Sequence, residues 1–79
     1  MNQKIAIYPN PTSGILKVIV NPCNNSGKII VKNISGMILK EVNIVSGEIS
    51  INLSSYSSGI YFIEVITEKN KMIQKVVKN

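Results

Sequence analysis

Apolar and polar residues alternate along this chain with a period of two, in short runs rich in β-branched side chains. The clearest run is residues 48–53, where apolar residues at 49, 51 and 53 alternate with polar ones. Such alternation is typical of a β-strand buried on one face. No stretch repeats apolar residues at the spacing of an amphipathic helix over a dozen positions. The pattern therefore predicts a protein built of strands alone.

Turn-forming Gly, Pro, Asn and Ser residues interrupt the alternation roughly every eight to twelve residues. They divide the chain into predicted strands at residues 5–8, 16–20, 28–34, 37–44, 48–53, 60–66 and 72–78. We expect the apolar members to face inward, namely Leu16, Val18, Val20, Ile29, Val31, Ile49, Ile51, Leu53, Ile63 and Val65. The fourth strand has mixed alternation. About seven antiparallel strands in one domain predict an all-β, Ig-like β-sandwich.

Two polar side chains fall on the predicted inner side. Asn33 continues the inward face of the third strand, and we expect its amide to bond backbone across the turn at Ser35-Gly36. Tyr61 follows a six-residue corner at the start of the sixth strand. That is the place of a tyrosine corner, whose ring packs in the core and whose hydroxyl bonds the preceding loop. Both residues are therefore expected to be structural.

The composition excludes many kinds of active site. The chain contains no His, Asp, Arg or Trp. It therefore cannot form a Ser-His-Asp or Cys-His nucleophilic site, a zinc site with imidazole ligands or an EF-hand loop. Glu48 and Glu64 fall on outward strand faces, where solvated acids are the expectation and a glycosidase pair is not. We expect no catalytic residue, no metal and no cofactor.

The size of the chain limits its core. At 79 residues and 8.7 kDa, one domain is expected, exposing roughly 4,700 Å² when folded against roughly 12,600 Å² unfolded. The only cysteine, Cys23, lies in a turn-like stretch and cannot close an internal disulfide. The fold must therefore depend on packing.

The formal net charge is +5, and lysines gather at positions 69, 71, 75 and 78. A basic patch for nucleic acid or an anionic membrane is one interpretation, but the absence of Arg and the few aromatics argue against nucleic acid. Lysines that protect a sheet edge are the favoured one. Apolar runs such as Ile60-Tyr61-Phe62-Ile63 fall far short of the roughly 20 residues of a transmembrane segment. No basic-then-apolar leader is present, so we expect no signal peptide in this piece.

The turn and strand motifs together form an ordered set. They are Tyr8-Pro9-Asn10-Pro11-Thr12-Ser13-Gly14, Asn33-Ile34-Ser35-Gly36, the stretch 53–65 and Lys75-Val76-Val77-Lys78. In this order the chain, from about residue 5 to 79, resembles the type A C-terminal sorting domain of Bacteroidetes cargo proteins. That domain is the signal read by the type IX secretion system.

The resemblance assigns translocon recognition to particular positions. Pro11 and Gly14 match the family's Pro-x-x-Gly motif, Gly59 and Tyr61 match its Gly-x-Tyr motif, and Lys75, Val76, Val77 and Lys78 match its basic-apolar terminal motif. The residues themselves indicate that Gly14, Gly59 and Tyr61 act mainly through folding. The terminal strand is the best candidate for direct contact, by strand addition to an exposed edge.

The resemblance also implies a biological role. Residues 1–79 would form one non-enzymatic C-terminal sorting domain, preceded in the parent protein by a cargo domain. It would direct a periplasmic cargo through the outer-membrane translocon. A sortase-like peptidase would then remove it, and the cargo would be attached to the cell surface or released.

A second class of function is compatible with the same architecture, because a fold does not define a function. A fibronectin-like or carbohydrate-binding accessory module would also be a small sandwich. Its sugar-binding face would need exposed aromatics, and Tyr8, Tyr56 and Phe62 are the candidates. A freed sandwich also has open sheet edges, so a weak homodimer through them is a further expectation.

Overall fold

The computed structural model describes residues 3–23, 26–68 and 70–79, which form seven strands and no helix. The strands are β1 (Lys4–Tyr8), β2 (Ile15–Asn21), β3 (Lys28–Asn33), β4 (Ile38–Asn43), β5 (Glu48–Asn52), β6 (Gly59–Ile66) and β7 (Lys71–Lys78). Each predicted strand is confirmed to within one residue at both ends.

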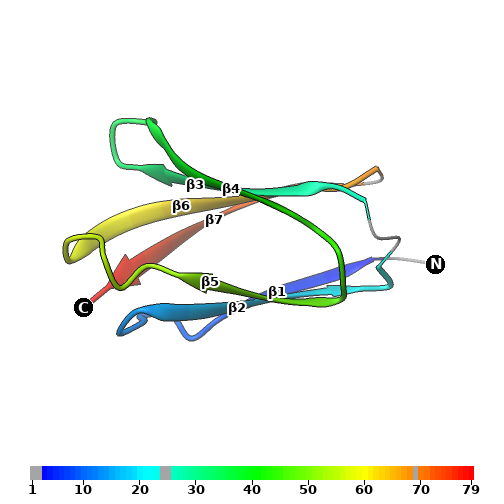
Figure 1. Ribbon diagram of the computed structural model, residues 1–79, viewed down its shortest axis with the longest axis horizontal. Helices are drawn as coiled ribbons and strands as arrows, with labels where there is room; N and C mark the ends of the chain where they lie inside the picture. Colours follow the sequence, from blue (N-terminus) through cyan, green and yellow to red (C-terminus); the bar gives the residue numbers. More distant parts are fainter. Residues whose placement is uncertain (1–2, 24–25, 69) are drawn as a thin grey trace.

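The strands form two facing sheets, as expected of an Ig-like sandwich (Figure 1). One sheet has the order β1-β2-β5 and the other the order β4-β3-β6-β7. All of these pairings are antiparallel. β1 and β7 are therefore edge strands of different sheets, and Thr12, in the segment that follows β1, forms a bridge with Lys78 at the end of β7.

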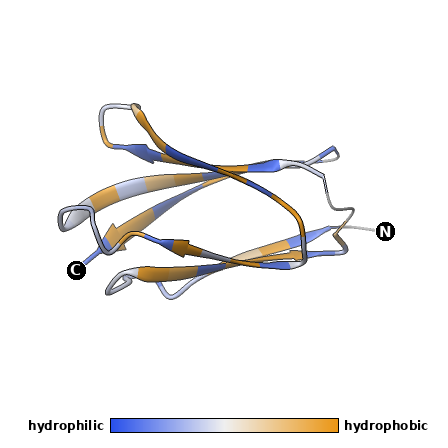
Figure 2. Ribbon diagram, in the orientation of Figure 1, coloured by the Kyte–Doolittle hydropathy of each residue, from blue (hydrophilic) through white to orange (hydrophobic). Residues whose placement is uncertain are grey.

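The core lies between the sheets and is formed by their inward side chains. Hydrophobic residues occur in every strand (Figure 2), and they alternate most clearly with hydrophilic ones in β5. All of the apolar residues that the alternation assigns to the inside are buried. The folded chain exposes 4715 Å², in agreement with the area expected for its mass. Burial of these side chains is the main stabilising contribution in so small a domain.

The structure confirms that the side chain of Asn33 bonds the backbone of the turn that follows β3. Its side-chain oxygen accepts hydrogen bonds from the backbone N–H groups of Ser35 at 3.0 Å and Met37 at 2.9 Å. These bonds close the turn between β3 and β4. Because a buried or half-buried amide is costly without partners, the pattern itself predicted that the turn would supply them.

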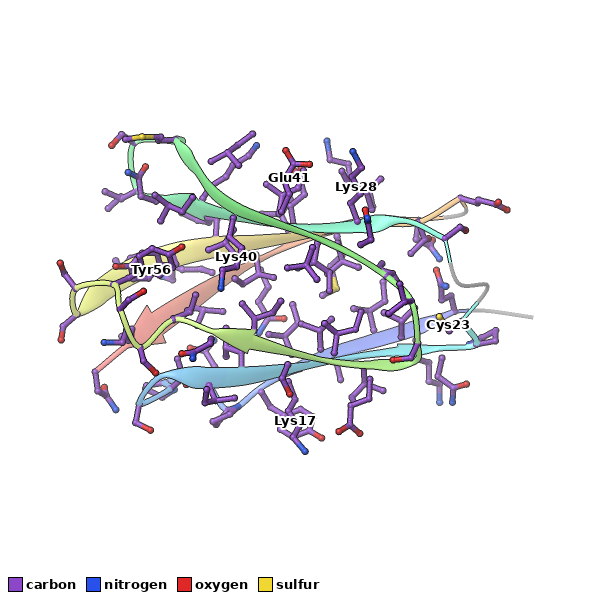
Figure 3. All side chains as sticks on the ribbon, viewed as in Figure 1. Lys17, Cys23, Lys28, Lys40, Glu41 and Tyr56 are labelled. Atoms are coloured by element: carbon purple, nitrogen blue, oxygen red, sulfur yellow. The ribbon has the colours of Figure 1, made fainter. Side chains whose placement is uncertain are left out.

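The mixed alternation of the fourth strand has a structural cause. The register between β3 and β4 shifts between Val31 and Lys32. Beyond this irregularity Lys40 points from β4 toward the facing sheet, where its ammonium group donates to the carbonyl of Asn52 at 3.3 Å (Figure 3). A β-bulge adds a residue on one strand, so inward and outward positions no longer follow a strict period of two.

The expectation of a solvated Glu64 is wrong. The residue lies on the outward face of β6, but only 6% of it is exposed. It stands in register between Ile30 of β3 and Ile73 of β7. Its carboxylate lies 3.8 Å from the ammonium group of Lys32 and 3.7 Å from that of Lys71. Neighbouring strands of a four-stranded sheet cover a central residue even on the outer face, and the two lysines compensate its charge.

Candidate functional site

The four motif segments lie at one end of the sandwich, here called the motif end. It consists of residues 9–14, 33–37, 53–61 and 75–79. Figure 1 shows the β1–β2, β3–β4 and β5–β6 connections together with the C-terminus on this side. The pairing of Asn33 with Tyr61 and of Gly59 with Lys78 places these segments in contact. Segments far apart in the sequence thus form one continuous region.

The Pro-x-x-Gly segment covers the outer edge of the terminal motif. The backbone N–H of Thr12 donates to the carbonyl of Val77, and the N–H of Asn79 donates to the carbonyl of Thr12, both at 2.9 Å. Thr12 and Lys78 form a parallel bridge. The segment therefore acts as a short extra strand beside the last residues of β7.

Asn10 extends this pairing with its side chain. Its amide nitrogen donates to the carbonyl of Lys75 at 2.9 Å, and its amide oxygen accepts the N–H of Val77 at 3.0 Å. A side-chain amide presents one donor and one acceptor as a backbone peptide does. Asn10 thus takes the place of a strand residue where Pro9 and Pro11 have no N–H to offer.

Thr12 is the buried centre of the segment and was missed by the sequence analysis. It is only 1% exposed. Its hydroxyl donates to the carbonyl of Ile15 and accepts the N–H of Gly14, each at 3.0 Å. A Cβ at Gly14 would stand 2.7 Å from the hydroxyl oxygen of the exposed Ser54, so a larger residue there would require that side chain to rotate away. A Thr between Pro and Gly is a local sequence signal for a turn in which the threonine hydroxyl accepts a backbone hydrogen bond.

Substitution of Thr12 by valine should lower the free energy of unfolding by about 1–3 kcal/mol. Valine keeps the shape of the side chain but leaves the N–H of Gly14 without its acceptor. Chemical denaturation of the purified 79-residue chain measures the loss. Substitution of the exposed neighbour Ser13 by alanine is the control and should change it by about 0.5 kcal/mol or less. Equal losses in the two variants would show that the hydroxyl has no special role.

The Gly-x-Tyr motif supports the terminal strand from its other side. Tyr61 pairs with Val76, is 7% exposed and donates a hydrogen bond from its hydroxyl to the backbone carbonyl of Ser57. This confirms the expected tyrosine corner. Gly59 has φ +152°, a value that side-chain-bearing residues rarely adopt. The motif therefore shapes the corner and packs against the terminal motif.

Burial divides the eight predicted recognition residues into groups. Gly14, Tyr61 and Val76 are buried, whereas Gly59, Val77 and Lys78 are half-buried, and Pro11 and Lys75 are exposed. The ammonium group of Lys78 donates to the carbonyl of Tyr56 at 2.8 Å. Of these eight residues, Pro11 and Lys75 therefore offer the most surface to a partner, while the buried ones act on the shape of the motif end.

Charged side chains of the described residues form ion pairs, and in two of these pairs both groups are exposed. Residues 3–23, 26–68 and 70–79 contain no cluster of three potential metal-ligating side chains. They also form no helix able to cross a membrane. On the outer face of the other sheet, a 3.1 Å hydrogen bond to Glu48 raises the pKa of Lys17 above its usual value (Figure 3). The stabilisation that accompanies this raised pKa is present at neutral pH and is lost as the pH rises through the raised pKa.

Comparison with known proteins adds an independent finding. A family model described as secretion system C-terminal sorting domain matches residues 6–79. Beta-agarase A of Zobellia galactanivorans is 33% identical to the chain over 67 residues, which cover 85% of this chain. The matched stretch spans only 12% of the agarase.

Proposed function

Since the chain belongs to the family of secretion system C-terminal sorting domains, the sorting signals of type IX secretion, we propose that its motif end is the surface read by the type IX translocon. Such a tail implies a protein destined for the cell surface or the medium. The family's role is that of a signal and not of a catalyst. The chain covers a small part of the relative that it matches, so a separate cargo joined ahead of residue 1 is part of the proposal.

The single observation that carries the proposal is the convergence of the motifs. Thr12 of the first motif, Gly59 and Tyr61 of the second and the terminal strand pair with one another at the motif end. Two of the motif residues, Pro11 and Lys75, are exposed. The proximity of the motifs supports contact of one partner with all of them.

The later steps of sorting complete the proposal. The cargo would pass through the periplasm and cross the outer membrane by the translocon. A sortase-like peptidase would cut the sorting domain from the cargo, which would then be attached to the surface or released. Cleavage ahead of β1 would leave the sandwich intact, because its core is formed within the described strands. A weak homodimer of the freed domain stays a prediction.

An export assay tests the proposal. Residues 1–79 are fused to the C-terminus of a periplasmic fluorescent reporter and expressed in a Bacteroidetes host with and without a working type IX translocon. We expect the reporter at the surface or in the medium only when the translocon works. A reporter that stays periplasmic in both strains, with the domain folded, would contradict the sorting role. Binding of the isolated domain to glycans would then favour the accessory-module alternative.

A further inference from the structure

The outer edge of β7 is only partly covered. In an antiparallel pair, alternate residues turn their backbone groups toward the partner strand. The N–H and carbonyl of Val77 and the carbonyl of Lys75 point away from β6, toward Thr12 and Asn10. By the same alternation Lys71 and Ile73 also point their backbone groups outward. Among the described residues, none bonds the outward backbone groups of Ile73 or the N–H of Lys75.

Side-chain hydrogen bonds mark the two limits of this uncovered stretch. At its far end, Gln3 accepts hydrogen bonds from the hydroxyl of Thr67 at 2.8 Å and the amide of Asn70 at 3.0 Å. At the motif end, Asn10 bonds Lys75 and Val77. Between these two groups of hydrogen bonds lies a stretch of β7 that we call the open window, defined as Lys71 to Lys75. The segments that flank β1 thus bond the loop before β7 and the last part of β7, and they do not bond the strand between these two places.

The side chains of the open window have a defined pattern. Lys71, Ile73 and Lys75 share the outer face of the sheet, and Ile73 is 57% exposed. The side chain of Lys71 is 61% exposed although it also faces Glu64. A lysine therefore stands two residues to either side of an exposed apolar residue. An edge strand with open backbone groups is a template for another strand.

The β7 strand of a second copy of the chain is a poor occupant of this window. Antiparallel pairing of two β7 strands centred on Ile73 would place Lys71 of one copy directly opposite Lys75 of the other. Like charges directly opposite each other in a sheet are destabilising. The same lysines would instead favour a strand with carboxylates at the two facing positions and an apolar residue between them.

We propose that the open window of β7 is completed by an extended segment of a partner protein, in which two acidic residues flank an apolar residue at a spacing of two. This deepens the function proposed above and rests on it, because the partner would belong to the secretion machinery. Backbone hydrogen bonds would supply the affinity, and the lysines and Ile73 would supply the selectivity. The motif end lies next to the window, so one partner can contact both.

Peptide binding to the 79-residue chain tests the inference directly. The probe is a capped peptide containing Glu-Thr-Val-Thr-Glu, and its control contains Lys-Thr-Val-Thr-Lys. In a titration followed by NMR, we expect the acidic peptide to shift the amides of Ile73 and Lys75 and to slow their hydrogen exchange. The basic peptide should bind several-fold more weakly. Equal binding of both peptides, or shifts confined to β4, would overturn the inference.

Two variants and one matched control sharpen this test. Lys75→Glu should remove the preference for the acidic peptide, whereas Lys4→Glu makes the same charge change on β1 and should preserve it. Ile73→Pro removes an outward N–H without breaking a bond to β6, so binding should be lost in a chain that still folds. Concentration-dependent shifts of the window amides without peptide would show that a second copy occupies it, which would also overturn the choice of occupant.

The export assay separates failure of this inference from failure of the proposed function. If the unmodified chain exports the reporter and Ile73→Pro is folded but not exported, strand addition is supported. If folded Ile73→Pro and Lys75→Glu are both exported as well as the unmodified chain, strand addition is wrong while the sorting role stands. If the unmodified chain itself fails to export the reporter, the proposed function fails.

Discussion

Substitution of Tyr61 by alanine is expected to lower the free energy of unfolding by about 3–5 kcal/mol. The ring is buried between the sheets, lies 6.0 Å from the ring of Tyr56, and its hydroxyl is bonded to Ser57. A domain of this length has a total stability of roughly 4–12 kcal/mol, at about 0.05–0.15 kcal/mol per residue. The variant should therefore lose a large share of the stability of the domain, and export should fall with the folded fraction.

Two further tyrosine variants control for this prediction. Tyr61→Phe keeps the ring and should cost about 1 kcal/mol, because only the hydrogen bond is lost. Tyr8 is 48% exposed, and Tyr8→Ala should cost about 1 kcal/mol or less. Thermal and chemical unfolding followed by circular dichroism measure all three. A Tyr61→Ala chain as stable as Tyr8→Ala would show that the tyrosine corner does not support the motif end.

Reversal of the charge at Lys75 should affect export without affecting stability. The side chain is exposed on the edge strand, and none of the ion pairs among the described residues involves it. A like-charge contact at a binding surface costs several kcal/mol, and every 1.4 kcal/mol is a factor of ten in affinity. We therefore expect Lys75→Glu to reduce export by about tenfold or more at an unchanged unfolding midpoint.

The matched control for Lys75 is Lys4→Glu, which alters the net charge equally on β1. It should be exported as well as the unmodified chain. Loss of export in both variants would indicate that the translocon responds to overall charge and not to the terminal strand. Lys78 is a less informative position, since its ammonium group also bonds the carbonyl of Tyr56. A substitution of Lys78 would therefore alter both the stability of the fold and the contact with a partner.

The fold could be predicted because its determinants are local. The period of two and the turn residues locate every strand, and the polar inward position of Asn33 predicts a turn that satisfies its amide. The tyrosine corner follows from the position of Tyr61 after a six-residue loop. None of these features requires knowledge of which strands are neighbours.

The site could be predicted only in part, because its geometry depends on long-range pairing. The roles of Asn10 and Thr12 depend on β7, more than sixty residues away. Alternation placed Glu64 outward correctly but could not show that strands on both sides would cover it. The register shift between β3 and β4 likewise arises from pairing, so the orientation of Lys40 was not predictable from its own strand.

The most direct test of the division between buried and exposed motif residues compares two variants of the exported reporter. Thr12→Val and Lys75→Glu are assayed beside the unmodified fusion, with and without the translocon, at a temperature where all three are folded. We predict export of Thr12→Val at the level of the unmodified fusion and loss of export for Lys75→Glu. Equal export of the two variants, whether high or low, would contradict the assignment of a folding role to Thr12 and of a contact role to Lys75.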